Sequence, residues 1–266
     1  MKPRSGLIAA AVVVALLGIA ALVPVLRLPA VVALALGVLL VPAGSPWRWT
    51  FAAGLPVALI LSFGWALADR LLVGPFECAD PLSPVAWARA LEAALVIGAI
   101  LGLAALLREP MADLGLRRPS RIEVVLGLGA IVLIPLPSLY LGTILAEPFF
   151  GRIELDLSQP LAIVPALTLA VANGTMEELA YRGALMHWLS RAAGPTVGLV
   201  GQAVVFWLAH NGPDFTGPAL PVVLAIMAGG LIAGLIVRRT GSLWLPIIVH
   251  ICFDVPLYYA AACRLI

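Results

Sequence analysis

LAIVPALTLAVANGTMEELAYRGAL, residues 161–185, is the stretch of sequence that decides the fold. Its apolar part, Leu161 to Thr175 and onward, is typical of a helix that crosses a lipid bilayer. Three ionisable side chains, Glu177, Glu178 and Arg182, follow directly on this apolar run. An unpaired ionisable group inside a bilayer costs about 2.5 to 3.5 kcal/mol on insertion scales. The stretch therefore predicts a membrane helix that carries a functional polar site.

The composition extends the membrane prediction to the whole chain. The 266 residues are 62% hydrophobic and 11% charged, with a mean hydropathy of +1.09, whereas soluble domains have about 25% charged residues. The net charge of +2 is too small, and the basic residues are too scattered, to indicate a nucleic-acid surface. The three cysteines form no CxxC pair, so we expect neither a disulfide framework nor a thiolate metal site.

Apolar runs separated by Gly and Pro predict an all-α, polytopic membrane bundle of about eight or nine transmembrane helices. The runs are Leu7–Leu26, Leu28–Pro42, Trp49–Ala68, Val85–Leu107, Ile122–Ala146, Leu161–Thr175 and onward, Thr196–His210, Pro218–Val237 and Leu243–Ala262. The second run is short, which leaves the count open. With nine spans, most basic residues fall on one side, which predicts that this side is cytoplasmic. It includes the cluster Arg108, Arg117, Arg118 and Arg121.

The EELAYR segment predicts different roles for its two glutamates. On a helix, Glu178 and Arg182 are i,i+4 neighbours and can pair, while Glu177 points about 100° away. Arg182 is expected to hold Glu178 charged, which leaves Glu177 free for chemistry. The alternative is that both glutamates lie in a headgroup region with Arg182 as a snorkelling anchor. Elsewhere, Arg89 and Glu92 are i,i+3 partners near a helix start and predict a mutually satisfied anchor.

Two histidines are candidates to join Glu177. If Gly194-Pro195 is the turn of a helical hairpin, Glu177 lies 17 residues before Gly194 and His210 lies 15 residues after Pro195. At a rise of about 1.5 Å per residue, both reach nearly the same depth. His250 and Asp254 are i,i+4 neighbours that can orient a tautomer, bind one metal ion or polarise a carbonyl. The alternative for this pair is a self-satisfied contact that fills a packing defect.

Other site chemistries lack their motifs in this sequence. There is no HExxH for a zincin-like site, no GxSxG for a serine nucleophile, and no pair of membrane aspartates with a GxGD pattern. A transporter should show internal repeats with paired broken helices, and no convincing repeat relates the two halves. A site built from glutamate and histidine remains.

Three motifs in order resemble the CPBP (ABI) family of intramembrane proteases, which includes the type II CAAX prenyl endopeptidases. They are EELAYRG at Glu177–Gly183, FWLAH at Phe206–His210 and HICFD at His250–Asp254. The resemblance covers roughly Leu161 to Asp254. We therefore expect a protease core over residues 117–266, preceded by N-terminal transmembrane helices without a recognisable motif over residues 1–116.

The resemblance implies a role for each site residue. Glu177 would activate the attacking water, His210 would assist, and His250 with Asp254 would stabilise the oxyanion, while Glu178 and Arg182 would support the helix. The related prenyl endopeptidases have Asn where this chain has Asp254, and an ionised Asp cannot donate a hydrogen bond. Three possibilities stay open for Asp254: it is protonated, it orients His250, or it joins Glu177, His210 and His250 in binding a divalent ion such as zinc.

The sequence thus predicts a membrane-embedded endopeptidase, glutamate-dependent or metallo-type, in a multi-pass protein of a bacterial inner membrane. Its partners would be membrane lipid and a peptide or protein substrate, which the resemblance suggests is prenylated or membrane-bound. The alternative is a non-catalytic membrane protein, a transporter or a bacteriocin-immunity or scaffold protein, that uses the same polar cluster for binding.

Overall fold

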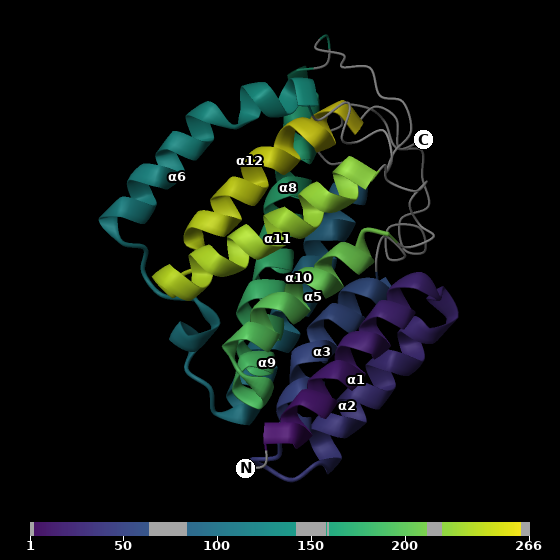
Figure 1. Cartoon of the computed structure of the whole chain (residues 1–266). Helices are drawn as coiled ribbons and strands as arrows, with labels where there is room; N and C mark the ends of the chain where they lie inside the picture. Colours follow the sequence, from purple (N-terminus) through teal and green to yellow (C-terminus); the bar gives the residue numbers. More distant parts are fainter. Residues whose placement is uncertain (1–2, 64–83, 142–157, 159, 212–219, 262–266) are drawn as a thin grey trace.

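The structure, a computed structural model, describes residues 3–63, 84–141, 158, 160–211 and 220–261 (Figure 1). All the elements in these ranges are helical, as the sequence predicts. The α-helices are α1 (Pro3–Leu22), α2 (Arg27–Leu40), α3 (Pro46–Phe63), α5 (Pro84–Leu107), α6 (Arg121–Leu133), α8 (Ile163–Glu178), α9 (Met186–Ala193), α10 (Pro195–Ala209), α11 (Leu220–Thr240) and α12 (Trp244–Ala261). Short 3₁₀ turns are η1 (Pro24–Leu26), η2 (Met111–Leu114) and η3 (Pro160–Ala162), and η4 (Leu179–Leu185) is a π-helix. Four predicted span ends, at 68, 146, 218 and 262, lie outside the described residues.

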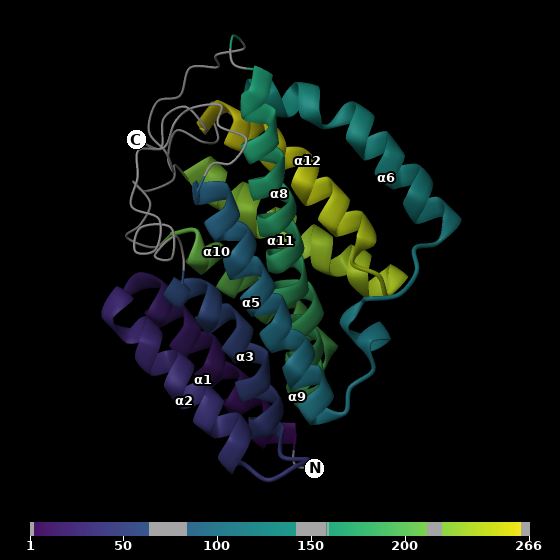
Figure 2. The same cartoon turned by 180° about the vertical axis from the view of Figure 1, so that it is seen from behind.

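The N-terminal helices α1, α2 and α3 lie together at one end of the molecule (Figures 1 and 2). Helix α3 packs on α1, α2 and α9. A small residue permits this close approach, since a Cβ atom added at Gly54 would lie 2.8 Å from Cγ1 of Val13. Buried residues of these helices and of α8 to α10 form one hydrophobic cluster. The N-terminal helices therefore support the motif-bearing helices from one side.

The centre of the fold is one long helical run, in which α8 continues through η4 into α9. The run ends at Gly194, whose φ of 100° favours glycine. Pro195 then begins α10, and proline suits this first helical position because it has no N–H to satisfy. Helix α10 packs back against α9 and η4. The predicted hairpin at Gly194-Pro195 is confirmed, and it returns His210 toward the level of η4.

Helices α12 and α5 pack against α8. Gly174 allows α12 to approach closely, since a Cβ atom added there would lie 3.2 Å from Cγ1 of Ile251. Figures 1 and 2 show α5 on one face of α8 and α12 and α11 on the opposite face. The polar end of α8 is thus surrounded by helices from distant parts of the chain.

Fewer helices than predicted meet the length and hydropathy expected of a membrane span. In the described part of the chain, Arg4–Leu22 and Ala86–Leu107 meet them, and a pair bent by 46°, Arg121–Leu133 with Pro135–Leu141, adds a third if it is one span. Pro24–Leu40, Pro195–Ala209 and Trp244–Tyr259 are apolar but shorter, and a bilayer core of about 30 Å takes roughly 20 helical residues. The membrane character of the fold is supported, whereas the count of eight or nine spans is not confirmed.

Candidate active site

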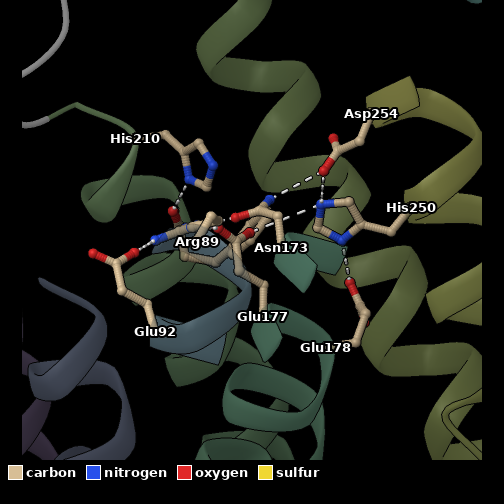
Figure 3. Close-up of polar contacts among 9 residues, drawn as sticks. Arg89, Glu92, Asn173, Glu177, Glu178, His210, His250 and Asp254 are labelled. Atoms are coloured by element: carbon tan, nitrogen blue, oxygen red, sulfur yellow. Dashed lines mark hydrogen bonds and ion pairs between the residues drawn. The ribbon is translucent and has the colours of Figure 1, made fainter. Parts of the chain in front are cut away.

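Ionisable and amide side chains from three helices meet at the polar end of α8 (Figure 3). Helix α5 contributes Arg89 and Glu92, α8 contributes Asn173, Glu177 and Glu178, and α12 contributes His250 and Asp254. Apart from His250, these side chains are buried. Buried charges are retained when they are paired or functional. The structure therefore brings together the first and the third sequence motif, as the resemblance implies.

Glu178 fixes the orientation of His250. One oxygen of Glu178, Oε1, lies 3.0 Å from Nη1 of Arg182 and 2.9 Å from Nδ1 of His250. A carboxylate oxygen held by a guanidinium accepts hydrogen bonds, so Nδ1 of His250 carries the proton of this contact. The predicted pairing of Glu178 with Arg182 is confirmed. Its consequence is that the other ring nitrogen of His250, Nε2, faces the interior of the site.

Nε2 of His250 lies between two carboxylates without a direct hydrogen bond to either. It is 3.8 Å from Oε2 of Glu177 and 3.6 Å from Oδ2 of Asp254. These distances exceed the usual range of about 2.7–3.2 Å for a hydrogen bond from nitrogen. Polar groups at such separations are commonly bridged by one water molecule. His250 and Asp254 lie on the same face of α12, as their i,i+4 spacing predicts, but their side chains form no direct hydrogen bond.

Glu177 is buried and yet accepts no hydrogen bond from any described residue. Its Oε2 atom is inaccessible and has no hydrogen-bond partner. The nearest charged nitrogens lie 3.8 Å away on opposite sides, Nη2 of Arg89 from Oε1 and Nε2 of His250 from Oε2. A buried carboxylate normally gains several hydrogen bonds that repay its desolvation. The carboxylate of Glu177 is thus placed next to cationic and imidazole groups without a hydrogen bond from the part of the chain that the structure describes.

Arg89 belongs to the site. The interpretation from the sequence, in which Arg89 and Glu92 form an isolated anchor, missed this. The predicted pair exists, since Nη1 of Arg89 donates to Oε2 of Glu92 at 2.8 Å. However, Nη2 of Arg89 also donates to Oδ1 of Asn173 at 2.6 Å and approaches Glu177. Helix α5 is far from α8 in sequence, so only their packing reveals this contact.

Asn173 links Arg89 to Asp254. Its Oδ1 accepts from Arg89, and its Nδ2 donates to Oδ2 of Asp254 at 3.0 Å. One signal could have identified it, because Asn173 lies four residues before Glu177 and therefore on the same helix face. Because Nδ2 donates to it, Oδ2 of Asp254 is a hydrogen-bond acceptor in this arrangement. Asp254 therefore has the contacts of a hydrogen-bond acceptor in this site.

Phe206 joins the second motif to the other two. Its ring centroid lies 4.6 Å from that of His210, 6.4 Å from that of His250 and 5.0 Å from that of Tyr181. The guanidinium carbon of Arg182 lies 4.1 Å from the same centroid, within range of a cation–π contact. One basic group from each motif, Arg182, His210 and His250, thus packs around this aromatic ring.

His210 ends α10 beside Phe206. Its Nδ1 lies 2.8 Å from the backbone oxygen of Phe206, and because a carbonyl oxygen only accepts, Nδ1 carries the proton. Figure 3 shows His210 and His250 on opposite sides of Arg89, Asn173 and Glu177. Both histidine rings thus contact Phe206, while the predicted approach of His210 to Glu177 stays a prediction.

The predicted metal-ligand set does not fit a divalent ion as it is placed. Such an ion needs several donor atoms that converge on one point. Within the described residues, one group has donor atoms that all lie within 4.8 Å of one another, and it consists of Glu109, Asp113 and His187. The predicted set of Glu177, His210, His250 and Asp254 does not meet this distance. Glu109 follows the opposite end of α5 from Arg89. The guanidinium of Arg89 beside Glu177 also opposes a second cation at the site.

Residues 159–256 match the family model of the Rce1-like type II CAAX prenyl endopeptidases. The match confirms the resemblance drawn from the three sequence motifs, and it contains Asn173, Glu177, His210 and Asp254. Arg89 and Glu92 lie outside it. Neither the curated proteins nor the solved structures contain a match to this chain. The family is one of membrane-embedded proteases, while the predicted division of the chain at residues 116 and 117 remains a prediction.

Proposed function

We propose that this protein, whose residues 159–256 match the Rce1-like family, is an intramembrane endopeptidase in which Glu177 activates a water molecule. The observation that carries the proposal is the buried carboxylate of Glu177, whose Oε2 has no hydrogen-bond partner among the described residues and lies 3.8 Å from Nε2 of His250. A general base must keep an oxygen free for the proton it will take. Glu178, its neighbour, also has an Oε2 without a hydrogen-bond partner among the described residues, but its Oε1 lies about 3 Å from Arg182 and His250, whereas the nearest charged nitrogens to Glu177 are 3.8 Å away.

In the proposed reaction, water binds between Glu177 and His250 and attacks the carbonyl carbon of the substrate. Glu177 accepts one proton from this water as the new carbon–oxygen bond forms. The proton then passes to the departing nitrogen as the carbon–nitrogen bond breaks, which releases an amine and a carboxylic acid. General-base catalysis of this kind contributes about 10²- to 10⁴-fold to a rate.

His250 is suited to stabilise the oxyanion of the tetrahedral intermediate. Its Nδ1 is committed to Glu178, so a protonated His250 presents its Nε2–H to the interior of the site. Three carboxylates, Glu177, Glu178 and Asp254, lie within 4 Å of its ring nitrogens and would balance that charge. A charged donor gives stronger hydrogen bonds than a neutral one. Electrostatic stabilisation of this type is often the largest single contribution to catalysis.

Asp254 and Asn173 are positioning residues in this proposal. Asp254 accepts from Asn173 and faces Nε2 of His250, so it orients the imidazole and does not donate to the oxyanion. Of the three possibilities that the sequence left open for Asp254, these contacts support orientation of His250. His210 lies at the end of α10, and we propose that it assists Glu177 by binding the water or the substrate carbonyl.

The substrate is expected to be a peptide or protein that approaches from the membrane, with a prenylated cysteine near its carboxyl end. This expectation rests on the family description alone. The multi-pass topology of eight or nine spans and the location in a bacterial inner membrane are likewise proposals. They rest on the apolar composition and on the distribution of basic residues in the sequence.

The proposal is tested by cleavage of a prenylated CAAX peptide by the purified protein in liposomes, with products identified by mass spectrometry. Wild type should release the carboxyl-terminal tripeptide, and Glu177→Gln and His210→Ala should not, although both should elute and melt as wild type does. An unprenylated peptide of the same sequence tests the prenyl requirement. Wild-type rates from a folded Glu177→Gln protein would overturn the proposal.

A further inference from the structure

A cavity of about 440 Å³ lies beside the start of α12. Its lining comes from three places: the connection between η2 and α6, Thr175 of α8, and the residues Leu243, Trp244 and Ile247. Ligand pockets for small molecules typically have volumes of about 300–1,000 Å³. The cavity is separate from the polar cluster around Glu177, and the proposed peptidase mechanism makes no use of it.

The walls of the cavity are held by hydrogen bonds between its own lining residues. The backbone nitrogen of Leu243 donates to the backbone oxygen of Gly115 at 3.0 Å, and Nε1 of Trp244 donates to the backbone oxygen of Arg117 at 3.0 Å. Gly115 has a φ of 80°, a conformation that favours glycine, and a Cβ atom added there would lie 2.8 Å from Leu243. The η2–α6 connection and the start of α12 are thus fixed to each other.

The charged groups that line the cavity are both cationic. Arg117 lies 3.9 Å from Oε2 of Glu123, but this oxygen already accepts from the backbone nitrogen of Ser120 in the capping box that begins α6. Arg118 is exposed, and it makes no hydrogen bond or ion pair with another described residue. At least one guanidinium at the cavity is therefore available for an anion.

The remaining walls are apolar and lead to an apolar helix. Leu116, Pro119, Leu243, Trp244 and Ile247 form them. Helix α6 stands apart from the rest of the bundle, with α12 as its neighbour (Figures 1 and 2). Gly127 faces Ile248 of α12, and large hydrophobic side chains elsewhere on α6 are exposed, among them Ile122, Val125 and Leu128, as expected of a helix in contact with acyl chains. A ligand with a long apolar tail would find continuous apolar surface here.

We propose that this cavity binds an anionic phospholipid, with its phosphate at Arg118 and Arg117 and its acyl chains along Trp244, Ile247 and α6. Basic pockets between membrane helices on the cytoplasmic side are a known form of lipid recognition, and the sequence predicts that Arg117 and Arg118 lie on that side. Exposed tryptophan next to arginine is typical of the membrane interface. The cavity adjoins the site helices through Thr175 and Ile247, so bound lipid would brace α8 against α12.

Lipid binding to the full-length protein tests this proposal without any measurement of proteolysis. Phosphatidylglycerol and phosphatidylcholine of equal chain length are titrated into detergent-solubilised protein, and bound lipid is counted by native mass spectrometry. We expect phosphatidylglycerol to bind in preference, and Arg118→Gln to weaken its binding about fivefold, which is roughly the contribution of one arginine near an anionic lipid surface. Arg239→Gln, which removes the same charge from the exposed end of α11 outside the cavity, should leave binding unchanged.

Three results would overturn the proposal. Equal binding of both lipids would show that the cavity does not select an anionic headgroup. Equal weakening by Arg118→Gln and Arg239→Gln would indicate attraction by diffuse surface charge. Displacement of the lipid by inorganic phosphate at similar concentration would identify a site for free phosphate instead of an amphiphile.

Discussion

Two buried glutamates, Glu177 and Glu109, have neighbours of the same kinds but differ in how they use them. Each lies near a histidine and an arginine. Both oxygens of Glu109 are occupied, Oε1 by Nη1 of Arg191 and Oε2 by Nε2 of His187 at 3.0 Å. The corresponding groups around Glu177, on Arg89 and His250, are each 3.8 Å away. Within the described residues, the carboxylate of Glu109 has hydrogen bonds to both oxygens, and that of Glu177 has none.

The difference separates a structural carboxylate from one that is available for chemistry. Glu109 joins the end of α5 to helix α9, and its hydrogen bonds to Arg191 and His187 account for its burial. Glu177 is supported indirectly, since the groups around it bond to one another through Asn173, Asp254 and Glu178. The described groups of the network thus bond to one another and give no hydrogen bond to the carboxylate of Glu177, an arrangement that suits a preorganised site.

The sharpest test of this comparison is Glu177→Gln, for which the largest effect is expected. The amide cannot take a proton from water, so the rate of peptide cleavage should fall about 10²- to 10⁴-fold. The thermal midpoint in detergent should stay close to that of wild type, because no hydrogen bond to a described residue is lost. A large loss of stability with a modest loss of rate would mean that Glu177 is structural like Glu109.

An exchange of the amide and the carboxylate tests the positioning role of Asn173 and Asp254. Asn173→Asp alone places two carboxylates in contact and removes the donor to Asp254, so activity should fall about 100-fold, near 3 kcal/mol. Combining it with Asp254→Asn restores one amide and one carboxylate and should recover most of that loss, a coupling of about 1–3 kcal/mol.

Rates of the four proteins, compared in one double-mutant cycle, check the exchange. Additive losses in the cycle would mean that the two residues do not act as a pair. A Thr168→Ser variant, altered on α8 at a half-buried position whose hydroxyl bonds within the helix to the backbone oxygen of Val164, provides the control for general effects of substitution in this helix.

Glu109→Gln should give the reverse pattern of Glu177→Gln. It weakens the contacts to Arg191 and His187, and because the Arg191 side chain is 44% exposed, we expect a loss of only about 1–2 kcal/mol. For a chain of this size that lowers the thermal midpoint by roughly 2–4 °C per kcal/mol. Turnover per folded molecule should be unchanged. A loss of rate as large as that of Glu177→Gln would mean that the two glutamates do not differ in function.

Removal of metal ions is expected to have the smallest effect. The predicted ligands around Glu177 do not converge, and Arg89 supplies a positive charge beside it. Dialysis against excess chelator should therefore leave both cleavage and the thermal midpoint unchanged. Activity that disappears with chelation and returns with zinc would contradict this and would restore the metallo-type interpretation.

Much of the site was predictable because it depends on helix periodicity. The pairing of Glu178 with Arg182 and the shared face of His250 and Asp254 follow from i,i+4 spacing, and the hairpin at Gly194-Pro195 follows from turn chemistry. The contact of Arg89 with Asn173 joins positions 84 residues apart. No local rule predicts it, because only the packing of α5 on α8 brings the two together.

The sequence by itself determined an all-helical, strongly apolar protein with three motifs that resemble those of the CAAX endopeptidases, because apolar runs and helical spacing are local properties of the chain. Only the tertiary structure decided which polar groups share the buried site. Arg89 joined it from outside the motifs, and Asp254 came to accept a hydrogen bond from Asn173. The lack of a hydrogen bond to Glu177 from the described residues is also a tertiary property. It arises because side chains on helices from distant parts of the chain bond to one another instead.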